Sequence, residues 1–135
     1  MQNVVYNSFK NGLMKGLFNF DSDVVKIALV YGYTASQNDT TWNDISSYEI
    51  SSNGYTSGGQ AIAPIIINCN NTTKLNINEN IVWDGTTVST TGAVIYNSST
   101  SDLICYVDFG GIQITDNGSF TLSWSLQDNN IISLA

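Results

Sequence analysis

The chain has 135 residues, of which 11% are charged, whereas soluble domains usually carry about 25%. Four lysines stand against eleven acidic residues, and the net charge of −7 leaves no basic patch for phosphates, which excludes nucleic acid and anionic membranes as partners. Arginine and histidine are both absent, which removes the imidazole of a catalytic triad and the arginine clamp for a carboxylate, so we expect a non-enzymatic protein without metal or cofactor.

The first predicted element is a short amphipathic helix over residues 4–16. Val5, Phe9 and Leu13 are spaced four apart, which places them on one side of a helix. The run Val24–Tyr33 is almost continuously apolar and predicts a central strand that is buried on both faces. Because each face of such a strand needs a cover, we expect the helix to lie over one face or one end of the sheet.

The middle of the chain predicts a long polar loop followed by strands. The sequence after the central strand loses periodicity, with one helical turn expected near Trp42–Ile45, and Tyr48–Ile50 has the pattern of a short strand. Gln60–Asn70 predicts the next strand, and its proline, Pro64, indicates a sheet edge or a bulge. Lys74–Asp84 begins with strict alternation and predicts a further strand.

The last third of the chain is also strand-like after a tight turn expected at residues 83–87. Its strand patterns cover Val88–Ser98, Asp102–Gly110, Ile112–Leu126 and Ile131–Ala135. Within Ile112–Leu126 we expect a hairpin, because Asn117-Gly118 supplies the positive φ angles of a type I′ turn. Beyond that turn Phe120, Leu122, Trp124 and Leu126 alternate with polar residues.

About eight strands with frequent turn signals and one N-terminal helix predict a mainly β fold. We expect an antiparallel β-sandwich, with a flattened barrel as the alternative, in a single domain over residues 1–135. Cys69 and Cys105 both lie in strand-like sequence. The pattern favours two buried thiols, and leaves a disulfide between neighbouring strands open.

Four acidic residues are the candidates for a paired-carboxylate glycosidase, namely Glu49, Glu79, Asp84 and Asp108. Asp108 lies in mid-strand, where an acid is unexpected, and we favour a solvent-facing or turn-capping role for it. Asp21-Ser22-Asp23 has half of a calcium-loop pattern but lacks the remaining ligands and the turn glycine, so we favour a turn. No catalytic or metal-binding residue is assigned.

Aromatic residues are the candidates for partner contact. Tyr33, Trp42, Tyr48 and Tyr55 lie in and around the long polar loop, and rings of this kind bind protein partners or sugars. The same residues also suit the hydrophobic core, and the sequence leaves both roles open for them.

Five segments in chain order resemble those of a widespread group of small virion proteins of tailed bacteriophages. The segments are YNSFK, KIALVYGYT, GYTSGG, YVDFG and NGSFTLSW. The resemblance spans nearly the whole chain and implies a structural part of the particle without catalysis. The chain departs from the group in its high Asn and Ile content and in its lack of arginine, which changes the chemistry of its surface.

The resemblance and the composition together predict a capsid-associated decoration or accessory protein that binds the assembled shell. One alternative is an adaptor at the neck, tail or fibre base, and another is a carbohydrate-binding module that uses Trp42 and Tyr55. Expected partners are the major capsid protein or neck and tail components, or further copies of this chain. Since no signal-peptide or bilayer-length apolar pattern is present, we expect synthesis in the host cytoplasm and a final location in the virion.

Overall fold

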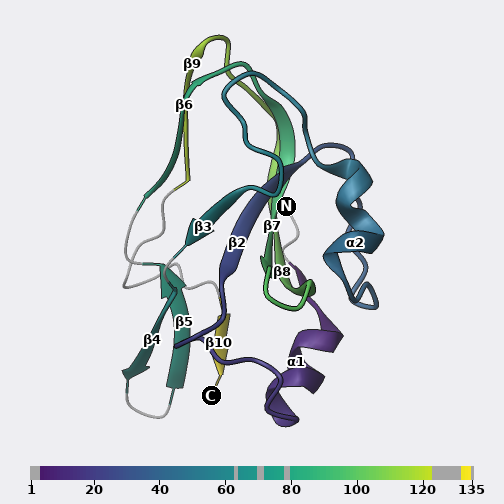
Figure 1. Cartoon of the computed structure of the whole chain (residues 1–135), viewed down its shortest axis with the longest axis vertical. Helices are drawn as coiled ribbons and strands as arrows, with labels where there is room; N and C mark the ends of the chain where they lie inside the picture. The colour runs from purple at the N-terminus through teal and green to yellow at the C-terminus, as the bar shows by residue number, and fades with distance from the viewer. Residues whose placement is uncertain (1–3, 63, 70–71, 78–79, 123–131, 135) are drawn as a thin grey trace.

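Figure 1 shows a computed structural model of the chain as a β-sandwich with two short helices. The structure describes residues 4–62, 64–69, 72–77, 80–122 and 132–134. Within these residues, ten strands form three antiparallel sheets. The prediction of a mainly β, antiparallel sandwich is therefore confirmed, and the largest sheet keeps two separate edges instead of closing into a barrel.

The largest sheet has five strands in the order β1-β8-β7-β2-β3. Their bounds are Val4–Val5, Asp102–Ile114, Ser89–Asn97, Val25–Val30 and Gln60–Ile62, in that order. The second sheet has the order β10-β5-β4, and β6 pairs with β9 in the third. The bounds of β10, β5, β4, β6 and β9 are Ile132–Leu134, Thr72–Ile77, Pro64–Cys69, Ile81–Thr86 and Gly118–Leu122. The helices are α1 (Asn7–Met14) and α2 (Trp42–Ile45), and a 3-10 turn spans Ser46–Tyr48.

Strand β2 is buried on both faces, as its apolar run predicts. Val25, Ile27 and Leu29 belong to one core cluster, which we call the inner cluster. Ala28 and Val30 alternate with them and belong to a second, outer cluster. The neighbouring strand β7 repeats this alternation, so the centre of the five-stranded sheet needs a cover on each side.

The inner cluster is covered by residues from the other sheets. Ile81 and Trp83 of β6, Phe120 of β9 and Leu75 of β5 all pack into it. The ring centroids of Trp83 and Phe120 lie 6.0 Å apart, and β6 and β9 bring these two residues directly opposite each other. Burial of this aromatic pair joins the third sheet to the five-stranded one.

The outer cluster is covered by a loop instead of a sheet. The segment from Tyr31 to Tyr48, which we call the outer layer, contributes Tyr33, Trp42 and Ile45 to this cluster. The expected helical turn is confirmed as α2, and it carries both Trp42 and Ile45. The Trp42 ring stacks on Tyr96 of β7 with centroids 4.7 Å apart and planes 9° apart.

The N-terminal helix is shorter than predicted, because Val4 and Val5 form a strand that pairs with β8. Helix α1 begins only at Asn7. Phe9 is buried in the inner cluster, and Val5 and Leu13 pack against it, so the predicted apolar side does face the core. The Phe9 ring also meets Phe18 at 4.9 Å, which makes the helix a cover for one end of the sandwich.

The predicted hairpin over residues 112–126 is wrong in its pairing. Ile112–Ile114 belongs to β8, where Ile114 pairs with Ser89 of β7, whereas β9 pairs with β6. Asn117 has the expected positive φ of 52°, but its turn links two different sheets. The expected turn at residues 83–87 is also wrong, because β6 continues to Thr86 through a register shift. Trp124 and Leu126 lie outside the described residues.

Two predicted strands are each divided in the structure. Gln60–Asn70 becomes β3 and β4, and Lys74–Asp84 becomes β5 and β6, in different sheets. Pro64 is the first residue of β4, at the edge of the second sheet, as expected.

Tyr48–Ile50 forms only an isolated bridge between Glu49 and Val30 instead of a strand. Cys105 is a buried free thiol, and the side chain of Cys69 is outside the described part of the structure.

Gly59 fixes the approach of the loop before β3 to β2. Its φ is +85°, and a Cβ there would lie 2.6 Å from the carbonyl carbon of Ile27. We expect Gly59→Ala to lower the free energy of unfolding by about 2–5 kcal/mol, because it adds a backbone clash to the left-handed strain. Gly32→Ala is the control, because Gly32 has a φ of +73° but an added Cβ would have nothing within 4 Å. This variant should lose about 1–2 kcal/mol of unfolding free energy. Equal losses in the two variants, measured by urea unfolding, would contradict this packing.

Candidate functional site

A chain of hydrogen bonds runs through the outer layer and orders its aromatic residues. The hydroxyl groups of Tyr6 and Tyr33 lie 2.9 Å apart, and Tyr33 donates to the carboxylate of Asp39. Asp39 also accepts from the Ser36 backbone N–H at 3.1 Å. Burial raises the pKa of both tyrosine hydroxyls well above the ordinary value, followed by the bond to Tyr33 for Tyr6 and the bond to Asp39 for Tyr33. The bond with Tyr6 acts in the opposite direction on the pKa of Tyr33.

A second network is centred on Glu49 and holds the loop that precedes β3. Its carboxylate accepts from the Tyr55 hydroxyl at 2.7 Å and from the Gly58 backbone N–H at 2.7 Å. The Tyr55 hydroxyl accepts from the Leu29 backbone N–H at 3.1 Å, and the Tyr96 hydroxyl donates to the Gly58 carbonyl at 2.6 Å. Burial, together with the charge of Glu49, raises the pKa of Tyr96 to about 12.

The structure places three of the four predicted contact residues in the interior. Trp42 and Tyr33 are 8% and 7% exposed, and both belong to the outer cluster. Tyr55 is half-buried against the inner cluster, with its ring stacked 6.3 Å from Trp83. Tyr48 is 44% exposed and lies with its ring 5.3 Å from Tyr33. Of the four, Tyr48 therefore has the most ring surface to offer a partner.

Tyr31 is an exposed aromatic residue outside the four predicted contact residues. It is 48% exposed, and its backbone N–H donates to the Tyr48 carbonyl at 2.9 Å, so the two residues are adjacent in the backbone. The sequence signal for Tyr31 was its position just after the apolar residues of β2, which end at Val30. Beyond the end of the strand, the alternation of inward and outward side chains no longer requires burial.

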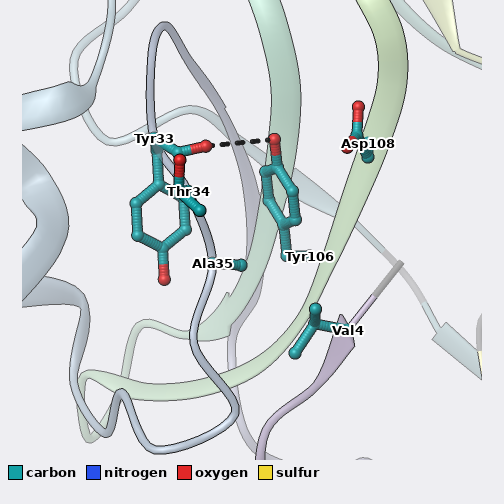
Figure 2. A pocket seen from close by; sticks show the side chains of 6 residues that line it. All are labelled: Val4, Tyr33, Thr34, Ala35, Tyr106 and Asp108. Carbon is teal, nitrogen blue, oxygen red and sulfur yellow. Dashed lines mark hydrogen bonds between the residues drawn. The ribbon is translucent and has the colours of Figure 1, made fainter. Parts of the chain in front are cut away.

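One pocket lies at the edge of the outer layer, between that layer and the strands β1 and β8 (Figure 2). It has a volume of about 100 Å³. Its lining residues are Val4, Tyr33, Thr34, Ala35, Tyr106 and Asp108. The Tyr106 hydroxyl donates a long hydrogen bond of 3.5 Å to the Tyr33 carbonyl, which closes one wall.

The pocket wall depends on the space that Gly92 leaves on β7. Gly92 lies opposite Asp108 in the sheet, and a Cβ at this position would come within 2.6 Å of the Tyr106 ring. Asp108 is held in turn by the Gly110 backbone N–H, which donates to its carboxylate at 2.8 Å. Both residues lie within β8, so this bond does not cap a turn as expected, and Asp108 is half-buried where it lines the pocket.

The other acidic residues considered from the sequence bind separate elements, a loop for Glu49, the neighbouring strand for Asp84 and a turn for Asp23. Glu49 binds the loop described above, and Asp84 of β6 accepts from the Ser119 hydroxyl at 2.8 Å. Asp23 accepts from Asn19 and from the buried Asn97 side chain, as expected for a turn. Glu79 lies outside the described residues. Over the part of the chain that is described, no three His, Cys, Asp or Glu residues form a group that could hold a metal ion.

Comparison with known proteins adds no relative to this picture. No protein-family model matches the chain, and neither does any curated protein or solved structure. Among the described helices, none is long and apolar enough to cross a membrane.

We expect the fold to lose stability sharply at alkaline pH. Burial raises the pKa of the Cys105 thiol and of five tyrosine hydroxyls, those of Tyr6, Tyr33, Tyr55, Tyr96 and Tyr106. These groups keep their protons in the folded chain but release them from the unfolded chain above their ordinary pKa values of 9.0 and 10.0. The contribution of these groups to the free energy of unfolding should be constant below about pH 9 and fall as the pH rises toward 12.

Absorbance of tyrosinate at 295 nm, followed together with circular dichroism, checks this expectation. The absorbance step that accompanies unfolding should correspond to at least the five buried tyrosines. The interpretation would be wrong if the full tyrosinate signal developed while the circular dichroism spectrum stayed native.

Trp42 and Tyr48 should differ strongly in their contribution to stability. Trp42→Ala removes a buried ring that stacks on Tyr96, and we expect it to lower the free energy of unfolding by about 3–5 kcal/mol. Tyr48→Ala removes a side chain that is 44% exposed and should cost less than about 1 kcal/mol. Urea unfolding of both variants measures the difference, and a small effect at Trp42 would contradict its place in the core.

Proposed function

We propose that this chain is a non-enzymatic structural protein of a tailed-bacteriophage virion, and within that class a capsid-associated accessory protein that binds the assembled shell. The observation that carries the proposal is the resemblance of five segments, in the same order over nearly the whole chain, to small virion proteins. An adaptor at the neck, tail or fibre base belongs to the same class of virion proteins. The copy number per particle distinguishes it from a capsid-associated protein.

The resembling segments coincide with the parts that build the sandwich. KIALVYGYT contains most of β2 and extends through Tyr33 to Thr34, while YVDFG lies within β8. GYTSGG is the loop that Glu49 and Tyr96 hold against the sheet. The resemblance therefore concerns residues that determine the fold. This supports a shared scaffold. Of the exposed tyrosines, Tyr31 lies within KIALVYGYT and Tyr48 lies outside the five segments.

The polar side chains of the described core support a structural role. Asp39 and Glu49 accept hydrogen bonds from buried or half-buried tyrosines and from loop backbone N–H groups. Carboxylates used in this way keep long loops in one conformation. A rigid loop layer suits a protein that presents a fixed surface to an assembly, because little conformational entropy is lost on binding.

The surface that we assign to the shell contact is the neighbouring pair Tyr31 and Tyr48. Tyrosine is enriched in protein interfaces, because it buries a large ring and keeps a hydroxyl for hydrogen bonding. The carbohydrate-binding alternative is less well supported, since it relied on Trp42 and Tyr55. The Trp42 ring is stacked on Tyr96, and the Tyr55 ring packs over Trp83.

The copy number of the chain in purified particles tests the proposal. Quantitative mass spectrometry should find it at a level comparable with that of the major capsid protein. A few copies per particle would instead place it at the neck, tail or fibre base, within the same class. Its complete absence from particles would overturn the virion proposal.

The Tyr31 and Tyr48 surface is tested with the same particles. Particles that lack the chain are incubated with purified protein, and we expect Tyr48→Ala to reduce occupancy while the variant remains folded. Val24→Ala is the control, because Val24 is 47% exposed but lies before the opposite end of β2 from Tyr31. Unchanged binding of Tyr48→Ala would move the contact to another face.

A further inference from the structure

The two ends of the molecule expose apolar side chains beside charges of opposite sign. Helix α1 lies at one end of the long axis, whereas β6 and β9 reach the other end (Figure 1). The end of β8 lies beside β6 and β9, because the hydroxyl of Thr115, the residue after β8, is 3.2 Å from the hydroxyl of Thr86 in β6. A surface on α1 and a surface at the end of β8 therefore face away from each other.

The surface on α1, which we call the helix surface, consists of Lys10, Met14, Lys15 and Leu17. Lys10 and Met14 are four residues apart and so lie on one side of α1. Met14 is 90% exposed and Leu17 is 57% exposed, and both lysines are exposed beside them. No acidic residue precedes Asp21 in the chain, so this surface is basic as well as apolar.

The surface at the other end, which we call the strand surface, consists of Ile112, Ile114 and Asp116. The two isoleucines are two residues apart in β8, a spacing that places side chains on one face of a strand. They are 51% and 71% exposed, and Asp116 is exposed in the turn that follows. Asp84, bound to Ser119 of β9, is a second exposed acid at this end. Because β6, β7, β8 and β9 contain no lysine, this surface is acidic.

We propose that the helix surface of one copy of this chain binds the strand surface of a second copy in a head-to-tail contact. Each bound pair leaves one surface of each kind free, so the contact repeats into a ring or a filament. The proposal concerns self-association of the chain and does not depend on the proposed virion function.

Charge selects a head-to-tail contact over a symmetric one. A two-fold contact joins the same surface of both copies. It would bring the two lysines of α1 onto the same lysines, or Asp116 onto Asp116, and like charges that face each other in an interface are unfavourable. The head-to-tail contact brings Lys10 and Lys15 toward Asp116 instead. Since the whole chain carries −7, copies repel one another in general, and the helix surface is where a second copy is attracted.

The apolar residues of both surfaces favour the same contact. Met14, Leu17, Ile112 and Ile114 are each more than half exposed, so most of their surface remains in water in a single copy. Removal of such surface from water is favourable, and the flexible methionine side chain adapts to the shape of a partner. The contact thus has an apolar centre with charged pairs beside it, which is the usual composition of a protein interface.

Self-association of the purified, full-length chain tests the proposal. Sedimentation velocity at increasing protein concentration should detect species larger than a dimer, because every head-to-tail pair leaves two surfaces free.

Two variants, each altered on one surface, test which surfaces meet. Met14→Glu places a carboxylate where Asp116 of the next copy lies, and Ile114→Lys places an ammonium group where Lys10 lies. Each variant alone should self-associate about tenfold more weakly or less. An equal mixture of the two should form a complex again, because the Ile114→Lys chain retains a native helix surface and the Met14→Glu chain retains a native strand surface.

Val82→Asp is the control for adding a charge to an exposed apolar position. Val82 is 38% exposed on β6 and belongs to neither surface, so this variant should associate like the unchanged chain. Circular dichroism checks that every variant is folded. Should Ile114→Lys fail to fold, Asp116→Lys replaces it, because Asp116 lies in the turn after β8.

Four results would overturn the proposal. They are a chain that stays monomeric or stops at a dimer at every concentration, undiminished association of either surface variant alone, an equal loss in Val82→Asp, and a mixture that associates no better than its two components. Absence of the chain from purified particles would refute the virion function and leave these sedimentation results unchanged, so the two failures are distinguishable.

Discussion

Strand β2 has to bury two faces, and the rest of the molecule is arranged around that requirement. Its residues alternate between the inner and outer clusters, and β7 beside it does the same. Two layers are therefore needed. On the inner side the chain supplies Trp83, Phe120 and Phe9 from strands and helix. On the outer side, among the described residues, the cover is Tyr6 together with a loop that has one helical turn around Trp42. The loop is thus a layer of the core.

A loop is a costly cover for a sheet, because its backbone polar groups and side chains also need partners. The outer layer meets this need with tyrosines, whose rings fill the core while their hydroxyls reach Asp39 and neighbouring tyrosines. Glu49 does the same for the loop before β3 through Tyr55 and Gly58. Glu49, one of the acids considered for a glycosidase, therefore stabilises a loop conformation. Buried rings and hydrogen bonds to two carboxylates hold these loops against the sheet.

Tyr33 connects the outer layer to its surroundings on two sides. Its ring lies 5.3 Å from that of the exposed Tyr48 and 5.3 Å from that of Tyr106, and it lines the pocket at the edge of the layer. Its hydroxyl also reaches Tyr6 and Asp39, so one residue both fills the outer cluster and takes part in its hydrogen bonds.

The sequence by itself determined the strand class, the buried central strand, the helical turn at Trp42–Ile45 and the edge position of Pro64. Each of these follows from local periodicity or from the backbone chemistry of one residue. Only the tertiary structure decided which strands pair, so β9 joins β6 across Trp83 and Phe120 instead of folding back on β8. It also decided that Trp42 packs inside while Tyr48 remains outside. Periodicity indicates which residues share a face, but burial depends on what the rest of the chain places against that face.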